Sequence, residues 1–408
     1  MNIIIVNDYA SVQGGAAQVA VASAKGLADS GHNITFIYAL GKADPLLNHP
    51  NIQLVNFEQY DLLSNPSRIN AMIVGIWNLS VAKQMDVVLN SFDKEDTIVH
   101  IHSWVKALSV SIVSVILKRK FLIVLTLHDY FTVCPNGGFY NYQRKSICHL
   151  EPMSLDCLAS NCDSRSYSQK LWRYLRQTFY IKAGMPSQIK HFISVSKFSE
   201  NILKPYLSKN AKFWDVPNPI DIQCHGKSNP EDSSVFSFIG RLSAEKGATL
   251  FADASNRLCV SARFVGDGNL ETILKNVKIN ADFIGWSNRV DVIRYIKDSR
   301  AIVFPSQLYE TQGLIVTEAA ALGVPSIVSN SCAASENIVD NKTGLLFESG
   351  NVESLMKKIQ LLSEKPDLAK KLGQNAYEQY WKNSDNIGKH LNCLTTCYQE
   401  VLNDFKTL

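Results

Sequence analysis

Several features that would assign a class of function are missing from this sequence. The N-terminal stretch, MNIIIVNDYA, has no basic segment and only a short apolar run, so it predicts a buried strand and not a signal peptide. The longest apolar stretch, ALSVSIVSVIL at 107–117, is too short to span a bilayer. A net charge of +4 over 408 residues is too small for a dedicated nucleic-acid binder. We therefore expect a cytoplasmic protein without a nucleic-acid partner.

The glycine fingerprint of dinucleotide-binding proteins, G-x-G-x-x-G, is also missing. SVQGGAAQVA, after the first apolar run, has only the pair Gly14 and Gly15, and FVGDGNLE at 264–271 lacks the third glycine. Two glycines before a helix still let backbone N–H groups approach a phosphate or a sugar. A tight turn without a ligand is the alternative.

Cysteine pairs with the C-x2-C spacing of common zinc sites are absent, although the chain has nine cysteines. Without an export signal, a reducing compartment is expected, where clustered thiols bind metal or stay unligated. An insertion at 134–162 holds four of the nine, Cys134, Cys148, Cys157 and Cys162. These four thiols predict a structural zinc site, and unligated thiols in a packed loop are the alternative.

What the sequence does contain is a regular alternation of short apolar runs with longer helical patterns. This alternation predicts βαβ units and therefore parallel sheets covered by helices. The expected strands lie at 2–7, 33–39, 97–102, 121–128 and 191–196, and then at 235–240, 262–267, 281–285, 301–306, 325–329 and 344–347. The fold class is therefore α/β, with two Rossmann-like, doubly wound domains in series.

The run DVPNPID at 215–221 breaks the alternation with two prolines and predicts the linker between the domains. We place the first domain at 1–217, with the cysteine-rich insertion inside it, and the second at 218–384. Only helical patterns follow position 350. The last of them, 385–408, carries aromatic and apolar residues suited to packing against another surface.

Ligands of open parallel sheets bind beyond the carboxyl ends of the strands, so the cleft between two such domains is the expected site. The second domain opens with FSFIGRLSAEKGATL, in which Arg241 and Lys246 follow a strand on a glycine-bounded loop. Two cations at this position suit a diphosphate, because charge-assisted hydrogen bonds are the strong ones. The alternative is a solvated loop with two surface cations.

The segment PSQLYETQGLIVTEAAALGVP at 305–325 places two carboxylates near the start of a helix. Glu310 lies in the loop, Gly313, Leu314 and Ile315 begin the helix, and Glu318 lies in its second turn. The free N–H groups at a helix start favour an anion. A carboxylate among residues as apolar as those around Glu318 needs hydrogen-bond donors, and sugar hydroxyls are suitable ones. Simple interaction of both acids with the helix dipole is the alternative.

Taken together, these motifs resemble those of the retaining glycosyltransferases of family 4, which have the GT-B fold. The resemblance rests on E-x7-E, GRLSAEKG, FVGDG, FIGW and the Gly-Gly pair after the first strand, and it covers nearly the whole chain. It implies a nucleotide-sugar donor bound mainly by the second domain and an acceptor bound mainly by the first. It also implies that the helix at 385–408 returns toward the first domain.

Carried over by position, the resemblance implies a role for each motif residue. Arg241 and Lys246 hold the donor diphosphate as it leaves, Glu310 binds hydroxyls of the transferred sugar, and Glu318 binds the ribose. Gly313, Leu314 and Ile315 offer backbone amides, Gly14 and Gly15 approach the diphosphate, and His128 lies beside the transferred sugar. For His128 the alternative is a histidine that caps a strand end.

The expected reaction is transfer of a hexosyl unit from a UDP- or GDP-sugar, with retention, to a glycan in surface polysaccharide synthesis (O-antigen, capsule or exopolysaccharide). No D-x-D triplet occurs, so we expect a metal-independent enzyme with no catalytic cofactor. Thr311 and Gln312 depart from the Gly-Phe or Pro-Phe of many relatives, which leaves the donor sugar open. The alternatives are a GT-B sugar-nucleotide epimerase, or a sugar-nucleotide-binding protein without turnover.

A stretch from Ser164 to Ser199 contains no acidic residue. Its cations are interleaved with aromatic residues and comprise Arg165, Lys170, Arg173, Arg176, Lys182, Lys190 and Lys197. Such a stretch predicts contact with an anionic membrane surface, here the inner face of the cytoplasmic membrane, and access to a polyprenyl-diphosphate-linked acceptor. A solvated helix face is the alternative.

Overall fold

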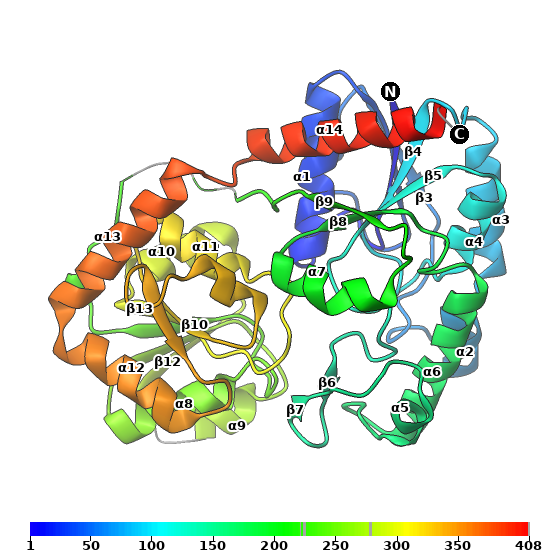
Figure 1. Cartoon of the computed structure of the whole chain (residues 1–408). Coiled ribbons are helices and arrows are strands. Elements are labelled where there is room, and N and C mark those ends of the chain that lie inside the picture. Colours follow the sequence, from blue (N-terminus) through cyan, green and yellow to red (C-terminus); the bar gives the residue numbers. More distant parts are fainter. Residues whose placement is uncertain (221, 223–225, 277–279, 407–408) are drawn as a thin grey trace. The chain divides into compact units, whose positions relative to one another are not determined.

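The computed structural model describes residues 1–220, 222, 226–276 and 280–406. The chain forms two compact units. Unit 1 comprises Met1–Gly138, His149–Pro219 and Asn386–Leu408, and unit 2 comprises Phe139–Cys148 and Ile220–Asp385. Each unit contains one parallel sheet with helices packed on it, so the predicted pair of doubly wound α/β domains is confirmed (Figure 1).

Unit 1 is built on a seven-stranded sheet of order β3-β2-β1-β4-β5-β8-β9, in which all neighbours are parallel. The strands are β1 (Asn2–Val6), β2 (Asn33–Tyr38), β3 (Ile52–Asn56), β4 (Thr97–Ile101), β5 (Leu122–Thr126), β8 (His191–Ser194) and β9 (Lys212–Asp215). The central strand β1 is buried on both faces from Ile3 to Val6, which explains its continuous apolar run. The two edge strands, β3 and β9, are not among the predicted ones.

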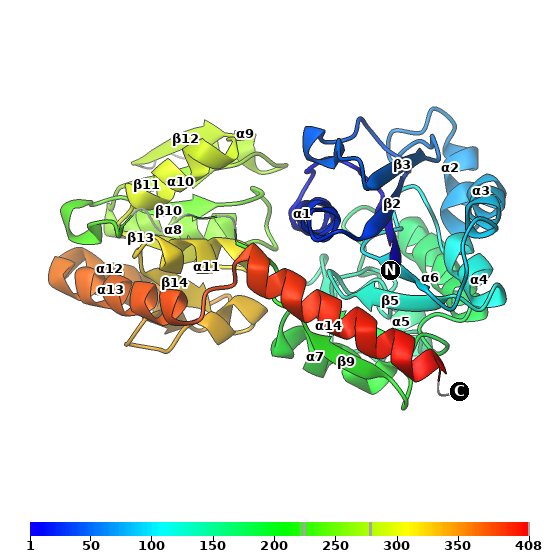
Figure 2. The ribbon, with the colours of Figure 1, turned by 90° about the horizontal axis from the view of Figure 1, so that it is seen from above.

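The helices of unit 1 are α1 (Gly15–Asp29), α2 (Arg68–Ile76), α3 (Leu79–Leu89), α4 (Ser111–Lys118), α5 (Leu155–Ala159), α6 (Tyr167–Lys182), α7 (Lys197–Leu203) and α14 (Ile387–Lys406). The C-terminal helix α14 lies beside α1, β4 and β5 (Figure 2). Its Leu394 and Val401 join the core formed by α1 and β1. His390 Nδ1 donates to the carbonyl oxygen of Pro217 at 2.8 Å, which ties the start of α14 to unit 1.

Unit 2 is built on a six-stranded parallel sheet of order β12-β11-β10-β13-β14-β15. The strands are β10 (Phe236–Ile239), β11 (Ala262–Val265), β12 (Ala281–Gly285), β13 (Ala301–Phe304), β14 (Ser326–Ser329) and β15 (Gly344–Phe347). All six coincide with predicted strands. A separate two-stranded hairpin is formed by β6 (Tyr140–Asn141) and β7 (Ser146–Ile147).

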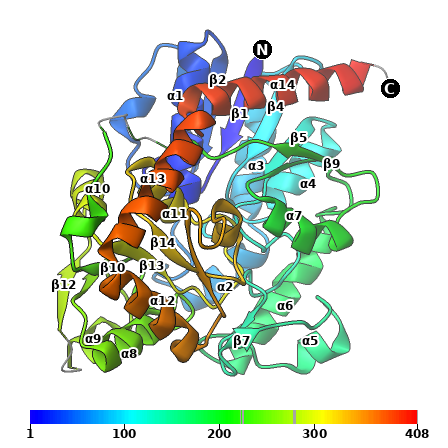
Figure 3. The same cartoon turned by 60° about the vertical axis from the view of Figure 1, so that its left-hand side comes forward.

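The helices of unit 2 are α8 (Ala248–Leu258), α9 (Glu271–Asn276), α10 (Arg289–Lys297), α11 (Leu314–Ala321), α12 (Val352–Glu364) and α13 (Pro366–Lys382). Apolar residues of α8, α12 and α13 pack with Phe236, Phe238 and Phe264 in one core. Apolar residues of α10 and α11 pack with Ile302 in a second core. Figure 3 shows α12 and α13 lying together beside this sheet.

The units divide the chain somewhat differently from the predicted domains. The chain passes from unit 1 to unit 2 at Pro219–Ile220, inside the predicted linker, and returns at Asp385–Asn386. Asp221, the last linker residue, and residues 407–408 lie outside the described residues. The prediction that the whole insertion 134–162 belongs to the first domain is wrong for Phe139–Cys148, which cluster with unit 2. The reason is packing, since the Phe139 ring lies 6.4 Å from that of Tyr309.

Candidate active site

The loop after β10 carries Arg241 and Lys246 and ends at Gly247, which precedes α8. Gly247 has a φ of +75°, and a Cβ at this position would lie 1.9 Å from the carbonyl oxygen of Pro305. No other residue allows this approach without displacing backbone. The glycine therefore lets the β10–α8 loop pack directly on the loop that follows β13. This contact between loops positions Lys246 beside the segment that contains Glu310.

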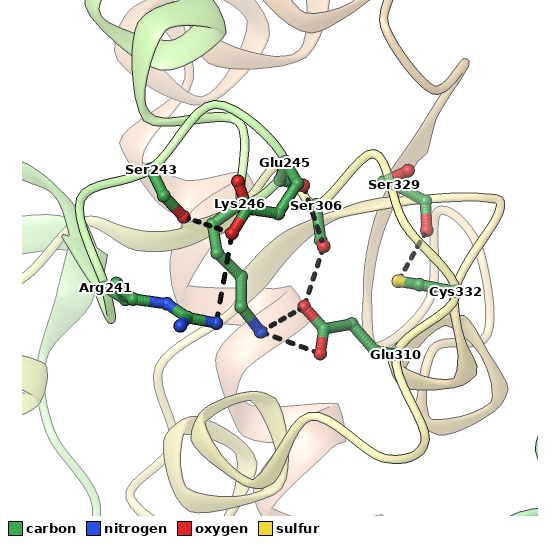
Figure 4. Close-up of polar contacts among 8 residues, drawn as sticks. All are labelled: Arg241, Ser243, Glu245, Lys246, Ser306, Glu310, Ser329 and Cys332. Atoms are coloured by element: carbon green, nitrogen blue, oxygen red, sulfur yellow. Dashed lines mark hydrogen bonds and ion pairs between the residues drawn. The ribbon is translucent and has the colours of Figure 1, made fainter. Parts of the chain in front are cut away.

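Lys246, Glu310 and Ser306 form a compact polar cluster (Figure 4). Lys246 Nζ donates to both carboxylate oxygens of Glu310, at 2.6 and 2.8 Å, and Ser306 Oγ donates to Oε1 at 2.7 Å. The Lys246 and Glu310 side chains are 24% and 13% exposed, so both remain accessible from solvent. An accessible ammonium and carboxylate held this close can exchange partners with a ligand that carries both anionic groups and hydroxyls.

Arg241 lies on the same loop but is held less closely. Its Nη2 is 3.8 Å from Glu245 Oε1, and its side chain is 65% exposed. Glu245 is buried and accepts a hydrogen bond from Ser243 Oγ at 2.8 Å. Figure 4 shows Arg241 paired with Glu245, on the loop that also carries Lys246. Arg241 is the more exposed of the two cations and can move toward a ligand.

The start of α11 supplies backbone donors. Gly313 precedes the helix with a φ of +112°, and a Cβ there would lie 2.6 Å from the Cβ of Ala334. As a glycine, this N-cap residue has no side chain with which to cap the helix. Leu314 and Ile315 form the first turn, whose amides have no intrahelical carbonyl to bind. A helix start of this kind is suited to an anion.

Glu318 is buried, but the structure supplies a donor for it from the protein. Arg289, the first residue of α10, donates through Nη1 to Glu318 Oε1. Burial raises the pKa of Glu318, and the guanidinium group of Arg289 opposes this shift. Arg289 is thus one of the hydrogen-bond donors that the burial of Glu318 was expected to need, and it comes from the protein. A role toward the ribose stays a prediction.

The remaining candidates belong to unit 1 and follow its strands β1 and β5. Gly14 precedes α1 with a φ of +142°, both it and Gly15 are exposed, and no atom lies within 4 Å of a Cβ built on Gly14. His128 is partly buried, and its Nε2 is 2.9 Å from Nδ1 of His102. Burial, and then the charge of His390, lower the pKa of His128 to about 3. The imidazole is therefore neutral at physiological pH, with one ring nitrogen as a hydrogen-bond donor and the other as an acceptor.

Asp129, beside His128, leads to a prediction about pH. Burial raises the pKa of Asp129 from 3.8 to about 6, so between these values the folded chain binds a proton that the unfolded chain has released. The stability contributed by Asp129 is fully present below the unfolded-state pKa of 3.8, and it is lost as the pH rises through the folded-state pKa of about 6. Asp129→Asn, neutral throughout, should therefore gain stability relative to the parent between about pH 4.5 and 7 in urea unfolding. If the difference in free energy of unfolding between the variant and the parent stays the same across this pH range, the assigned pKa is wrong.

The cysteine-rich insertion contains a buried lysine. Lys170 is 1% exposed, and its Nζ donates to Sγ of Cys157 at 3.2 Å. Of the four cysteines, Cys134, Cys157 and Cys162 are buried and Cys148 is partly buried. Among the described residues, no group of three His, Cys, Asp or Glu side chains could hold a metal ion. The structure thus gives the zinc site no support, and it stays a prediction.

Three residues of these clusters escaped the sequence reasoning. His102 directly follows β4 and Ser306 lies two residues after β13, positions that could have identified both, whereas Arg289 begins a helix. Asp8 follows β1 and is fully buried. It accepts hydrogen bonds from Ser103 Oγ and from the backbone amides of residues 106, 107 and 108. Its function is structural, because every donor comes from the loop after β4.

Comparison with known proteins adds the family. Residues 13–223, just over half of the chain, match the family described as Glycosyltransferase Family 4, and residues 223–379 match Glycosyl transferases group 1. An uncharacterized glycosyltransferase of Methanocaldococcus jannaschii is 27% identical over 191 residues, which cover 46% of this chain and 53% of that protein. A galactosyltransferase of Escherichia coli, UDP-Gal:alpha-D-GlcNAc-diphosphoundecaprenol alpha-1,3-galactosyltransferase, is 31% identical over 159 residues, covering 36% and 40%.

Among solved structures, HepE of Anabaena in complex with UDP-glucose matches this chain with a TM-score of 0.66. The match covers 100% of both chains at 17% identity. A match at this low identity supports the fold alone. The predicted fold is therefore confirmed by a match over the full length. On the family matches and the two parallel sheets, the chain belongs to glycosyltransferase family 4 and has the GT-B fold.

Proposed function

We propose that this glycosyltransferase moves a hexosyl unit from a UDP- or GDP-sugar to a lipid-linked glycan in surface polysaccharide synthesis, with retention and without a catalytic metal. The observation that carries the proposal is the cluster of Lys246, Glu310 and Ser306, which precedes the start of α11 at Gly313. The name of the E. coli relative, which begins with UDP-Gal, supports the donor class. The name of the E. coli relative, which acts on a diphosphoundecaprenol-linked sugar, supports the acceptor class.

Sugar transfer from a nucleotide-sugar requires fixed positive charge near the leaving diphosphate. Breaking the anomeric C–O bond leaves negative charge on the departing diphosphate, and preorganised cations and amides stabilise this charge at little reorganisation cost. We assign this role to Lys246, to Arg241 and to the backbone amides of Gly313, Leu314 and Ile315. The donor's own phosphate oxygen then assists the acceptor hydroxyl on the face that the leaving group occupied, which retains the configuration.

Binding of the donor would rearrange the ion pair. Without ligand, Lys246 donates both of its short hydrogen bonds to Glu310. A diphosphate offers Lys246 a stronger partner, and the sugar hydroxyls can then donate to the carboxylate that Ser306 still holds. Glu310 would thus orient the sugar while Lys246 binds the leaving group. Within unit 2, Glu318 is assigned to the ribose. The roles of Gly14, Gly15 and His128 of unit 1 stay predictions from the sequence.

A ligand screen by thermal unfolding tests the donor site. UDP or GDP, at about 100 times its Kd, should stabilise the chain by about 2.7 kcal/mol and raise Tm by several degrees. NAD, which carries a diphosphate but needs a different fingerprint, serves as the control and should have no effect. The shift should persist in EDTA, since no metal is assigned to the site. If neither nucleotide raises Tm above the NAD value, the donor assignment fails.

A further inference from the structure

Two helices of unit 1, α2 and α6, lie side by side (Figure 1). Trp172 Nε1 on α6 donates to the carbonyl oxygen of Met72 on α2 at 3.1 Å. Gly75 of α2 allows this approach, because a Cβ there would lie 2.8 Å from the Trp172 ring. Neither helix contains a carboxylate. Acidic residues are absent from the sequence for the whole of 62–85 and 164–199.

Three of the four cations of α6 are turned away from solvent, contrary to the expectation from the sequence, and only Lys182 at its end is exposed. Lys170 is buried against Cys157, and Arg176, 4% exposed, lies over the rings of Phe131, Trp172 and Tyr180. Arg173 pairs with the buried Asp163 at 2.8 Å. These three cations are therefore not available for the predicted membrane contact, whereas the other cations of the stretch are exposed, namely Arg165, Lys182, Lys190 and Lys197. Lys170, Arg173 and Arg176 stabilise the inner face of the helix.

The outer face of α6 is apolar instead, and α2 extends it. Tyr167, Leu171 and Leu175, spaced one turn apart, are 39%, 41% and 47% exposed. On α2, Ile69, Met72 and Ile73 are 74%, 52% and 61% exposed at helical spacing. We call these six residues the α2–α6 face. Large apolar side chains gathered in this way on a soluble surface mark an interaction site.

Charge around the α2–α6 face identifies its partner. Arg68 at the start of α2 and Lys182 at the end of α6 are exposed, and both helices lack an acid. An apolar surface with a cationic rim fits the interface of an anionic bilayer, where apolar side chains enter the headgroup region and cations approach phosphates. In the described part of the chain, no single helix is long and apolar enough to cross a bilayer. The helices α2 and α3 meet the length and apolarity criteria only when taken together, and they are bent by 43° relative to each other.

We propose that the α2–α6 face docks on the surface of an anionic lipid bilayer. The proposal rests on exposed side chains and charge, and it does not depend on the sugar-transfer activity. Docking of unit 1 at this face would hold the enzyme where lipid-linked glycans are found. The membrane contact would be interfacial, by the sides of two helices, without a spanning segment.

Sedimentation with large unilamellar vesicles tests the proposal. The full chain should bind vesicles of phosphatidylglycerol and phosphatidylethanolamine, bind phosphatidylcholine vesicles more weakly, and lose affinity in high salt. The triple variant Ile69→Ser, Ile73→Ser, Leu171→Ser should bind about tenfold less tightly, because it removes three apolar anchors. A matched control, Leu46→Ser, Ile273→Ser, Val339→Ser, changes three residues that are 53%, 57% and 48% exposed elsewhere, and should bind like the parent.

The outcomes separate folding, lipid binding and catalysis. An unchanged Tm and an unchanged UDP or GDP shift in the triple variant would show that it folds and that the donor site is intact. Equal vesicle binding by the triple variant and the parent would overturn the proposal, as would failure of the parent to bind anionic vesicles. A self-association in vesicle-free solution that only the triple variant loses would assign the face to a second copy of the chain and would also overturn it.

Discussion

Glu310→Ala is expected to lower sugar transfer by about a hundredfold or more while leaving the fold intact. The carboxylate accepts from Lys246 and Ser306, and in our proposal it takes hydroxyl donors of the transferred sugar in the same place. Removing it leaves the Lys246 ammonium, 24% exposed, free to bind water, so stability should change little. The measurement is kcat/KM for the donor, together with Tm.

Glu271→Ala is the matched control for this change. Glu271 also lies in unit 2 and also accepts from a lysine, Lys275 Nζ at 2.7 Å, but it lies on α9 outside the cluster. The control should keep both its activity and its Tm. Near-normal turnover of Glu310→Ala would remove this carboxylate from the mechanism. Equal losses in both variants would point to a general effect on unit 2.

Arg289→Ala is expected to have the largest effect on stability. It leaves Glu318, 5% exposed, as an uncompensated buried carboxylate, and loss of one partner of a buried ion pair costs about 3–5 kcal/mol. Burial already raises the pKa of Glu318, and loss of Arg289 raises it further. Protonation relieves the penalty, so the loss should be greatest at neutral pH and smaller as the pH falls. Urea unfolding at two pH values measures it.

Two further variants define the origin of this loss. Arg294→Ala removes a cation of the same helix that is 60% exposed and pairs with Asp291 at 3.1 Å, so it should cost less than about 1 kcal/mol. The double variant Arg289→Ala, Glu318→Gln should regain part of the lost stability, because the amide carries no charge. If Arg289→Ala costs no more than Arg294→Ala, the ion pair does not hold α10 on α11.

The strands that the sequence reasoning missed are the edge strands of unit 1. Most residues of β3 and β9 are at least partly exposed, and their sequences, IQLVN and KFWD, mix polar and apolar residues. An edge strand is covered less completely and is held by one neighbour, so its sequence need not be uniformly apolar. The central strands were predictable because they are buried on both faces, as IIIV in β1 shows.

The candidate site was predictable in its residue types but not in its contacts. The sequence placed Lys246 and Glu310 after two different strands, and parallel topology explains why both loops lie at the same edge of the sheet. Sequence spacing could not show that Arg289 contacts Glu318, because the two belong to different helices. It could not reveal either that Ser306, in the loop after β13, donates to Glu310, since a serine after a strand has many possible roles.

By itself the sequence determined the class of the fold, its division at the linker near residue 219, and the family motifs. These properties follow from local periodicity and from residues at fixed spacing, and both can be read directly from the amino-acid sequence. Only the tertiary structure decided which side chains of α6 face inward. Lys170, Arg173 and Arg176 turn toward Cys157, Asp163 and aromatic rings, and Leu171 and Leu175 turn outward. Charged side chains of a helix usually face solvent and apolar ones face the core, and here this arrangement is reversed. The groups that bind the buried cations belong to other segments of the chain, so the periodicity of α6 alone could not predict their burial.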